Sequence, residues 1–440
     1  MLAWLQWRLK GLAMDLAYRL PLALVARLAP SPMRMISFYL AKADSPRALQ
    51  YLDHLVRISP EVGCLMRLDE RLRRGSISGV DLVDSIPSSI LRKLNSYKDV
   101  HLNDAARAFN RLGCLRLGGA LRGLLLIKLV QQRFRSPAKQ GWELDALLLE
   151  VSANDYSRRL FSRPELWEDG LDRQVQDRIE LLRCSDMLVK LRVFVDSERL
   201  PCGEHEASLS GLSVLLQGPS RRESNLAGTP CDVVGTIGYS GAGSLARLVE
   251  GRHVSFYRPY KIRAMIAEGL TERFNDVDLA VVTKRGLGVL EAQFTPECRV
   301  ACSKVRERFG LGFLNGGTEF LIWLLACDLN RLFVTNVDLF LNPAYPVGYL
   351  PSNYQKSHLS KDAAQWQTQS WATLMVFGDH EPSQQYSIYK AFHGYDSVVY
   401  DSMLDAIVSA PFSAYAEALE DAYRVWPQGP VVDCCGGGSA

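Results

Sequence analysis

The sequence lacks several features that would place it outside the ordinary globular proteins. Cysteine is sparse, with 10 in 440 residues, whereas disulfide-stapled secreted domains contain it far more densely. Neither sign of charge dominates, because 51 Lys and Arg face 48 Asp and Glu, and this balance argues against a nucleic-acid-binding protein. The remaining description is a globular chain, 48% hydrophobic, with length for roughly two or three domains.

Motifs for several common chemistries are missing as well. No Gly-Lys-Ser/Thr triplet occurs, which excludes a P-loop. Cys298 and Cys302 are not spaced as a zinc knuckle, and no convincing Asp-x-Asp metal site is present. The cysteines are therefore interpreted as buried thiols in a reducing compartment, and neither a metal nor a cofactor is expected.

Residues 1–30 are predicted to form a basic amphipathic helix. Leucines recur every three or four positions from Leu2 to Leu16, while Arg8 and Arg19 interrupt any signal-peptide core or membrane span. Two interpretations stay open: the helix lies on an anionic membrane surface, or it packs on its own domain. With no leader or span indicated, we expect a cytoplasmic protein, peripheral on the inner membrane under the first interpretation.

Helical periodicity dominates residues 31–204, which are predicted to form an all-helical domain. Apolar residues repeat every three or four positions over 45–58, and a second helix follows Pro60 and ends near Gly75. This pair resembles a tetratricopeptide helical hairpin, and a looser copy occurs near 103–134. Two copies leave open whether the domain is a repeat array or a plain bundle. Residues 83–100 are predicted to be a loop.

The pattern changes at residue 205, and residues 205–428 are predicted to form an α/β domain. Short apolar runs alternate with helical stretches, which is typical of a doubly wound, mostly parallel sheet. Ligands of such sheets bind beyond the carboxyl ends of the strands. Residues 429–440 are expected to be a flexible tail. The predicted strands lie within 212–220, 231–241, 252–258, 278–284 and 331–340.

Two glycine-containing turns are candidate nucleotide-binding segments because each follows a predicted strand. The first contains Gly218, Pro219 and Ser220, with Asn225 shortly after, and glycine there lets the backbone approach a bound group. The second begins at Gly235 and Thr236, and it does not match a dinucleotide fingerprint. For the first turn, a plain structural turn is the alternative interpretation.

Two further candidates lie at predicted helix starts. Gly316, Gly317 and Thr318 precede an apolar helix, whose unpaired amides can hold an anion, although Thr318 could also be a simple cap. His380 precedes another helix, where an imidazole can act as a general base or donate to a phosphate. A structural role is the alternative for His380.

Taken in order, these segments resemble the sialyltransferase superfamily, in particular its bacterial sialyltransferase-like members. The resemblance covers about residues 212–405, and its specificity lies in the order of degenerate motifs. The chain departs from the family pattern at 235–237 and at Asn336, so we expect either an altered donor pocket or a different donor sugar. The matching segments lie at 218–220, 232–234, 316–318, 332–340, 345–349 and 380–382, with Gln385 following.

The resemblance implies a sheet of the sialyltransferase type, a variant of the GT-A and GT-B glycosyltransferase folds. It implies a metal-independent transferase that moves a 2-ulosonic acid, Kdo or sialic acid, from a CMP-activated donor to a saccharide or lipid-linked saccharide. The product would belong to bacterial surface polysaccharide or lipopolysaccharide.

The resemblance also implies roles for individual residues. His380 would move the proton, and Tyr345 or Tyr349 would steady the phosphate. Ser240, Arg258 and Lys261 are candidates for binding the sugar carboxylate. A retaining mechanism would need a carboxylate nucleophile, for which Asp232, Glu291 and Asp379 are candidates.

Two alternatives from other classes remain. The chain could be a non-catalytic helical adaptor with a decayed transferase domain, an interpretation supported by the departures at 235–237. It could instead be another nucleotide-binding α/β enzyme, which would depend on a metal and a carboxylate pair.

Overall fold

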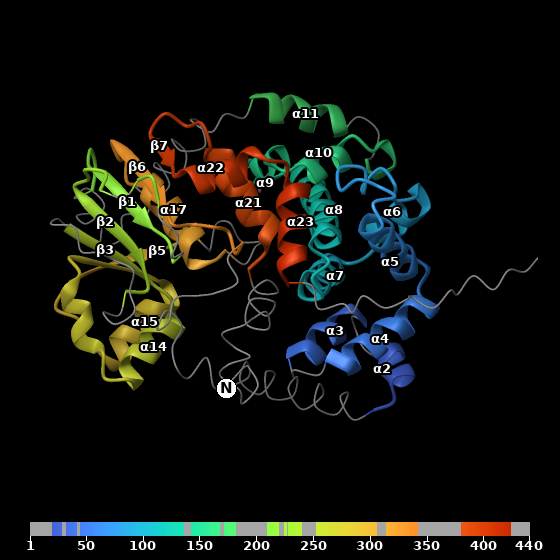
Figure 1. The fold of residues 1–440 in the computed structure, drawn as a ribbon, viewed down its shortest axis with the longest axis horizontal. Coiled ribbons are helices and arrows are strands. Elements are labelled where there is room, and N and C mark those ends of the chain that lie inside the picture. Colours follow the sequence, from blue (N-terminus) through green and yellow to red (C-terminus); the bar gives the residue numbers. More distant parts are fainter. Residues whose placement is uncertain are drawn as a thin grey trace, which may run out of the picture.

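The computed structural model places a parallel sheet at one end of the molecule and a group of helices at the other (Figure 1). Of the predicted basic helix at 1–30, only 20–28 are described, and helix α2 (Leu22–Leu28) lies there. The predicted tail at 429–440 lies outside the described residues. The structure describes residues 20–28, 32–41, 45–135, 142–167, 171–181, 209–219, 224–226, 228–239, 252–305, 314–341 and 380–423.

The described residues from 20 to 181 form helices and no strands. We call helices α2 to α11 the helical half. The predicted pair at 45–75 is confirmed as α4 and α5, with Ser59 as the N-cap of α5. The predicted loop at 83–100 is wrong, because α6 forms there and buries Leu91 and Leu94. The helices after α2 are α3 (Pro32–Ala41), α4 (Ser45–Ile58), α5 (Pro60–Arg73), α6 (Ser88–Asn95), α7 (Asp99–Arg111), α8 (Leu115–Phe134), α9 (Trp142–Ala153), α10 (Asp155–Phe161) and α11 (Leu171–Leu181).

Among the described residues the sheet has seven strands, all parallel, which confirms the predicted α/β class. The sequence predicted five of these strands and missed β5 and β7. Their order across the sheet is β5-β4-β3-β2-β1-β6-β7. The strands are β1 (Ser213–Gln217), β2 (Val233–Ile237), β3 (Arg252–Tyr257), β4 (Leu279–Thr283), β5 (Arg299–Ser303), β6 (Arg331–Thr335) and β7 (Val398–Tyr400).

The direction of winding reverses beside β1. Strands β2 to β5 extend the sheet on one side of β1, and β6 and β7 extend it on the other. Between β1 and β6 the register pairs Ser213 with Arg331 and Gln217 with Thr335. Connections from these two neighbouring strands leave in opposite directions, so a topological switch point lies between β1 and β6, and ligands of open α/β sheets usually bind at the carboxyl end of such a point.

Helices cover both faces of the sheet. On one face, α17 (Gly316–Ala326) packs against β2 and β3, with Phe320 stacked on Phe256 at 5.7 Å between ring centroids. On the other face, α14 (Pro259–Ala267) and α15 (Lys284–Gln293) bury a separate apolar cluster around Tyr257 and Phe274. The strands carry nearly continuous apolar runs for this reason.

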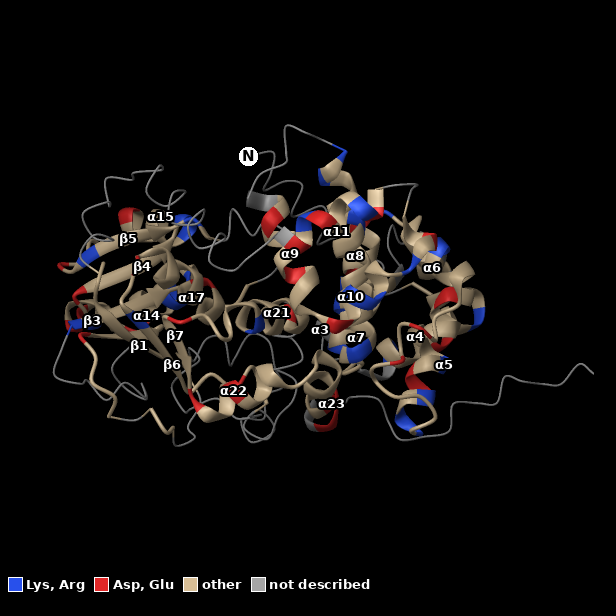
Figure 2. Ribbon diagram, turned by 90° about the horizontal axis from the view of Figure 1, so that it is seen from above, with Lys and Arg blue, Asp and Glu red and all other residues tan. Residues whose placement is uncertain are grey.

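The last helices of the chain join the sheet to the helical half. Helix α21 (Pro382–Phe392) packs against α8 and α9 on one side and α17 on the other, and it lies between the two groups in Figure 2. Helix α23 (Phe412–Tyr423) packs on α8 and α10, and α22 (Ser402–Ser409) packs on α21. One apolar cluster therefore runs through both ends of the molecule.

Glycines on α8 allow this close packing. A Cβ on Gly118 would come within 1.9 Å of the Asn110 Oδ1, and one on Gly119 within 2.3 Å of the Phe412 ring. The Arg116 guanidinium on the same helix forms a buried ion pair with Glu420 at 2.8 Å. No helix among the described residues is both long and apolar enough to traverse a lipid bilayer.

Candidate functional site

The backbones that follow β1 and β6 approach each other closely at the switch point between these strands. Gly218 follows β1, and its amide donates to the Thr335 carbonyl at 2.7 Å. A Cβ on Gly218 would lie 2.3 Å from the Asn336 carbonyl oxygen, so glycine is required by the chain itself. The predicted turn at 218–219 therefore lies at the carboxyl edge as expected, and its glycine already has a structural reason.

Asp401, the residue after β7, connects three segments at this edge. Its Oδ2 accepts from the Asn336 amide at 2.8 Å and lies 3.2 Å from the Thr335 hydroxyl and 3.3 Å from that of Ser224. Its Oδ1 accepts from the Leu404 amide at 2.9 Å and so caps α22. We call Asp401, Thr335, Asn336 and Ser224 the switch-point cluster.

The backbone after β6 is held in an unusual conformation. Asn336, Leu339 and Phe340 have φ values of 56°, 44° and 73°, the left-handed region that side chains other than Asn and Asp seldom adopt. Such conformations persist only where the surroundings impose them, and they concentrate at binding and catalytic sites. We call residues 336–340 the strained segment, and it begins beside Asp401 at the carboxyl edge of the sheet.

His380 lies at the same edge because its ring stacks on Phe340. The ring centroids are 6.4 Å apart and the planes differ by 9°. Phe340 belongs to the strained segment after β6, while His380 lies two residues before α21 begins. The structure therefore brings the predicted proton-transfer residue beside the segment after β6 through an aromatic contact that the sequence did not indicate.

A second group of polar side chains surrounds the start of α17. The Asn315 side chain is the N-cap and accepts from the Thr318 amide at 2.7 Å. The Thr318 hydroxyl lies 3.5 Å from the Gln385 Oε1 of α21. Gly316 and Gly317 fit closely against Ile237 at the end of β2. The predicted segment 316–318 is therefore a capped helix start at the carboxyl edge.

Neighbouring cations at this edge are partly committed to the protein itself. Arg258 follows β3, and its Nη2 pairs with the Glu319 Oε2 of α17 at 2.9 Å and donates to the Leu314 carbonyl at 2.5 Å. The Lys261 stem lies beside the backbone of Gly238, and burial lowers the pKa of its ammonium group. Arg258, a candidate for the sugar carboxylate, thus already balances a buried glutamate.

Gly235 and Thr236 do not form a turn, contrary to the sequence prediction. Both lie within β2, where Gly235 pairs with Leu216 on one side and Val254 on the other. A Cβ on Gly235 would lie 3.2 Å from the Phe320 ring, so this glycine lets α17 approach the sheet.

Thr236 is part of a buried polar network in the middle of the sheet. Its hydroxyl lies 2.8 Å from the His253 Nε2 and 3.0 Å from the Ser255 Oγ. Burial lowers the pKa of His253, which favours its neutral form beside the two hydroxyls. These contacts give Thr236 a structural role between strands.

Asp232 and His380 are not brought together. Asp232 precedes β2 and accepts from the Ser213 amide at 2.8 Å, at the amino edge of the sheet. The carboxyl edge is about 13 Å away along a five-residue strand. The two residues predicted as catalytic therefore cannot act on the same atom in this arrangement.

Asn225 and Glu291, two further candidates, lie at different places in the fold. The Asn225 side chain accepts from the Ser402 amide at 2.8 Å, which joins the loop after β1 to α22. Glu291 is exposed on α15, a helix on the face of the sheet opposite α17. Ser220, Ser240, Tyr345, Tyr349 and Asp379 lie outside the described residues.

Sequence reasoning missed the switch-point cluster and the partners of α21. Asp401 carries a recognisable signal, because an aspartate between a short apolar strand and a helix is a typical N-cap. Its partners Thr335 and Ser224 become neighbours only through the strand order, which the sequence did not predict. The described part of the chain contains no group of three or more His, Cys, Asp or Glu residues arranged to hold a metal ion.

Together, these groups offer hydroxyls, amides and the His380 imidazole beside the switch point between β1 and β6. Hydroxyl and amide groups can bind a nucleoside or a phosphate, and an imidazole can accept or deliver a proton. Scans of the chain against protein-family models, curated proteins and solved structures find no match to any of them.

Proposed function

We propose that the protein is a glycosyltransferase that moves a 2-ulosonic acid, Kdo or sialic acid, from a CMP-linked donor to a saccharide. The observation that carries this proposal is the topological switch point between β1 and β6, which has the strained segment, the switch-point cluster and His380 beside it. Crevices at the carboxyl ends of open parallel sheets are the usual position for a nucleotide. The family resemblance of the ordered motifs then supplies the identity of the donor.

In this account the cytidine lies over the ends of β1 and β6, and the phosphate points towards the start of α17. The α17 start faces the ends of β2 and β3, roughly 7 Å from β1 at the usual strand spacing. Amides in the first helical turn and the positive end of its dipole favour a phosphate there. This arrangement supports a leaving group that carries a single phosphate.

The transfer forms a bond between the acceptor oxygen and C2 of the sugar, and it breaks the bond between C2 and the phosphate oxygen. The bonding electron pair leaves with CMP, and the acceptor hydroxyl gives its proton to His380. His380 is the residue for this step because its ring lies on Phe340, in the strained segment that follows β6. Proton transfer by a positioned group contributes roughly 10²- to 10⁴-fold to a rate.

The remaining parts of the proposal concern the helical half and the product. The fold would be of the sialyltransferase type, with the helical half, a tetratricopeptide-like bundle, on the acceptor side. The enzyme would work in the cytoplasm on lipopolysaccharide or another surface polysaccharide, with residues 1–30 on the inner membrane surface. Helix α21 supports placing the helical half on the acceptor side, because it begins just after His380 and packs against the helical half.

The test is to incubate the protein with CMP-Kdo or CMP-sialic acid, with and without EDTA, and to measure turnover as the release of CMP. We expect release with one of these donors, and a roughly 10²-fold or larger loss in His380→Gln. His393→Gln is the matched control, since His393 is a partly exposed histidine paired with Asp405 at 2.8 Å, at the far end of α21. Equal activity in both variants would remove His380 from the mechanism.

Two other outcomes would favour the alternatives. CMP binding without turnover of either donor would favour the non-catalytic adaptor. Turnover or binding that requires a metal and a different nucleotide would favour another α/β enzyme.

A further inference from the structure

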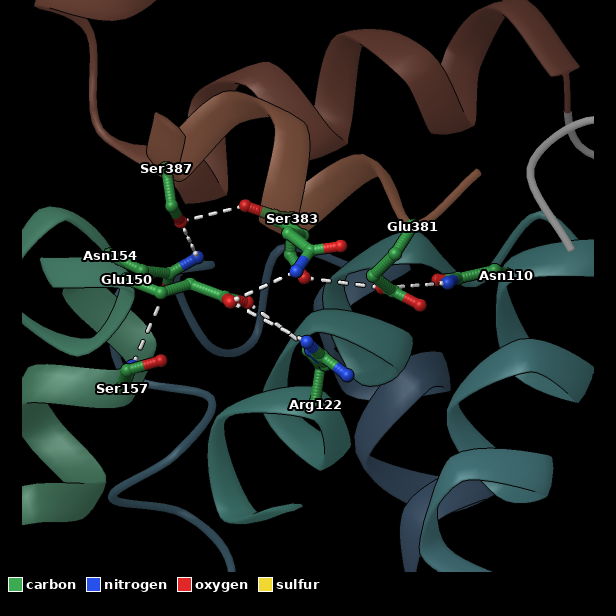
Figure 3. Close-up of polar contacts among 9 residues, drawn as sticks. Asn110, Arg122, Glu150, Asn154, Ser157, Glu381, Ser383 and Ser387 are labelled. Carbon is green, nitrogen blue, oxygen red and sulfur yellow. Dashed lines mark hydrogen bonds and ion pairs between the residues drawn. The ribbon is translucent and has the colours of Figure 1, made fainter. Parts of the chain in front are cut away.

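The face of α21 that meets the helical half is polar, although it is buried. Three sets of contacts cross this interface, and they lie side by side in Figure 3. Asn110 bonds Glu381, the ion pair of Arg122 and Glu150 bonds Gln384, and Asn154 bonds Ser387. Buried polar contacts add little net stability compared with apolar packing, so their value lies in fixing a geometry.

The first of these contacts is next to His380 in the chain. The Asn110 Nδ2 donates to the Glu381 Oε1 at 3.0 Å, and the Ser383 hydroxyl donates to the same oxygen at 3.1 Å. Burial raises the pKa of the Glu381 carboxyl group above its ordinary value. Within the described chain, the Glu381 side chain forms no capping hydrogen bond to α21. Its carboxyl group therefore holds this point of the backbone to α7 and to Ser383.

Asn110 is itself fixed by the surface of α8. The position of Gly118 leaves space for the Asn110 carboxamide, whose Oδ1 would be only 1.9 Å from a Cβ there. Asn110 is 1% exposed and Glu381 is 4% exposed. The route from α8 to the His380 backbone therefore runs through two buried side chains.

We propose that Glu381 and Asn110 are positioning residues for His380: the helical half sets the place of the proton-transfer group through the hydrogen bond from Asn110 to Glu381. The proposal rests on the proposed function for its catalytic consequence. The placing of the ring itself rests only on the contacts described above. The stacking partner Phe340 fixes one face of the ring, and the bond from α7 fixes the backbone that carries it.

The interface offers its own control. Ser387 lies on the same helix, is 0% exposed and is bonded to Asn154 at 3.4 Å, but it is one and a half turns or more from His380. Removing its hydroxyl disturbs the same interface without touching the link to His380. The conservative change Glu381→Gln keeps an oxygen that can accept both bonds made by Oε1.

The experiment compares Asn110→Ala, Ser387→Ala and Glu381→Gln. With the CMP-linked donor that the wild-type protein turns over, we expect Asn110→Ala to lower kcat roughly 10- to 100-fold with KM unchanged, because misplacing a reacting group by about 1 Å costs this much or more. Ser387→Ala and Glu381→Gln should stay within about threefold of wild type. Equal kcat in Asn110→Ala and Ser387→Ala would overturn the proposal.

A second measurement needs no donor. The rate at which diethyl pyrocarbonate modifies His380, followed by peptide mass spectrometry, reports how firmly the ring is held. It should rise at least about threefold in Asn110→Ala and stay unchanged in Ser387→Ala. If the wild-type protein turns over neither donor while this difference is seen, the proposed function fails and the positioning stands. The same rate in all variants overturns the positioning.

Discussion

Helices α17 and α21 of the α/β part are of equal length and differ in the contacts of one buried face. Each has 11 residues and is buried along nearly its whole length. Helix α17 packs Phe320 on the Phe256 ring of the sheet, whereas α21 and its N-cap residue Glu381 face the helical half with the polar groups of Glu381, Gln384 and Ser387. Apolar burial tolerates small shifts, while hydrogen bonds require particular distances and angles.

This difference separates stability from placement. α17 ties its strands together through area removed from water, which is non-directional. His380 lies two residues before α21. The polar contacts of Glu381 and Gln384 fix where the start of this helix lies relative to α7 and to the ion pair on α8 and α9. We infer that the interface with the smaller net stabilisation is the one on which function depends.

The largest effect is expected at the apolar helix. Phe320→Ala should lower the free energy of unfolding by about 4 kcal/mol, because it empties a site between Gly235, Phe256 and Trp323. Urea denaturation measures this loss, and Phe320→Leu should lose clearly less. A loss below about 1 kcal/mol for the alanine variant would mean that α17 is not held by its packing.

Next in size is the buried ion pair beneath α21. Arg122→Met should cost about 3 kcal/mol, because Glu150 would keep a buried charge with Gln384 as its remaining donor across the interface. The double change Arg122→Met with Glu150→Leu should recover most of that loss, as measured by denaturation. If the double variant were as unstable as the single one, the ion pair would be a net source of stability.

A smaller effect is expected for a single hydrogen bond in the same interface. Ser387→Ala should cost about 1 kcal/mol, since it removes the bonds that the hydroxyl makes with Asn154 and with the Ser383 carbonyl. The melting temperature of purified protein is a sufficient measure. A change as large as that of Phe320→Ala would contradict the contrast between the two helices.

The smallest effect is expected in the pH dependence of the free energy of unfolding, and it comes from Glu381 at the N-cap of α21. Burial raises the pKa of Glu381 above its ordinary 4.5, although Arg122, Asn110 and Ser383 oppose this rise. The folded state therefore favours the protonated carboxyl group, and its contribution to stability is present below pH 4.5 and is lost as pH rises through the folded-state pKa.

Relative to wild type, Glu381→Gln should therefore gain stability as pH rises above 4.5. Denaturation curves at several pH values from 4.5 upwards measure this. Parallel pH profiles for the two proteins would show that the carboxyl group titrates alike in both states.

Much of the fold could be predicted because its elements have strong local signals. The strand at 279–283 is a run of buried apolar residues, and α17 begins at the glycine pair that marks it in the sequence. Strand β7 has three residues, and α6 begins in a serine-rich segment, so neither carries enough periodicity to be recognised. Gly235 was mistaken for a turn because its reason, the ring of Phe320, lies far away in sequence.

For the candidate site as well, residues with a local sequence signal could be predicted and residues defined by long-range contacts could not. Gly218, Thr318 and His380 were predicted from local context, and the structure places all three at the carboxyl edge of the sheet or next to it. Asp232 was chosen because it belongs to the motif at 232–234 and carries a carboxylate, and it lies at the opposite edge. Asp401 was missed because its partners come from β6 and from the loop after β1, which only the strand order brings together.

The most direct test of the account is calorimetric titration of the protein with CMP, comparing Thr335→Val with Thr236→Val. Both threonines are buried near the ends of parallel strands, 3% and 4% exposed, but only Thr335 belongs to the switch-point cluster. We expect wild type and Thr236→Val to bind CMP alike, with EDTA present, and Thr335→Val to bind roughly 10-fold more weakly. Equal binding by all three, or no binding of CMP by the wild-type protein, would contradict a nucleotide site between β1 and β6.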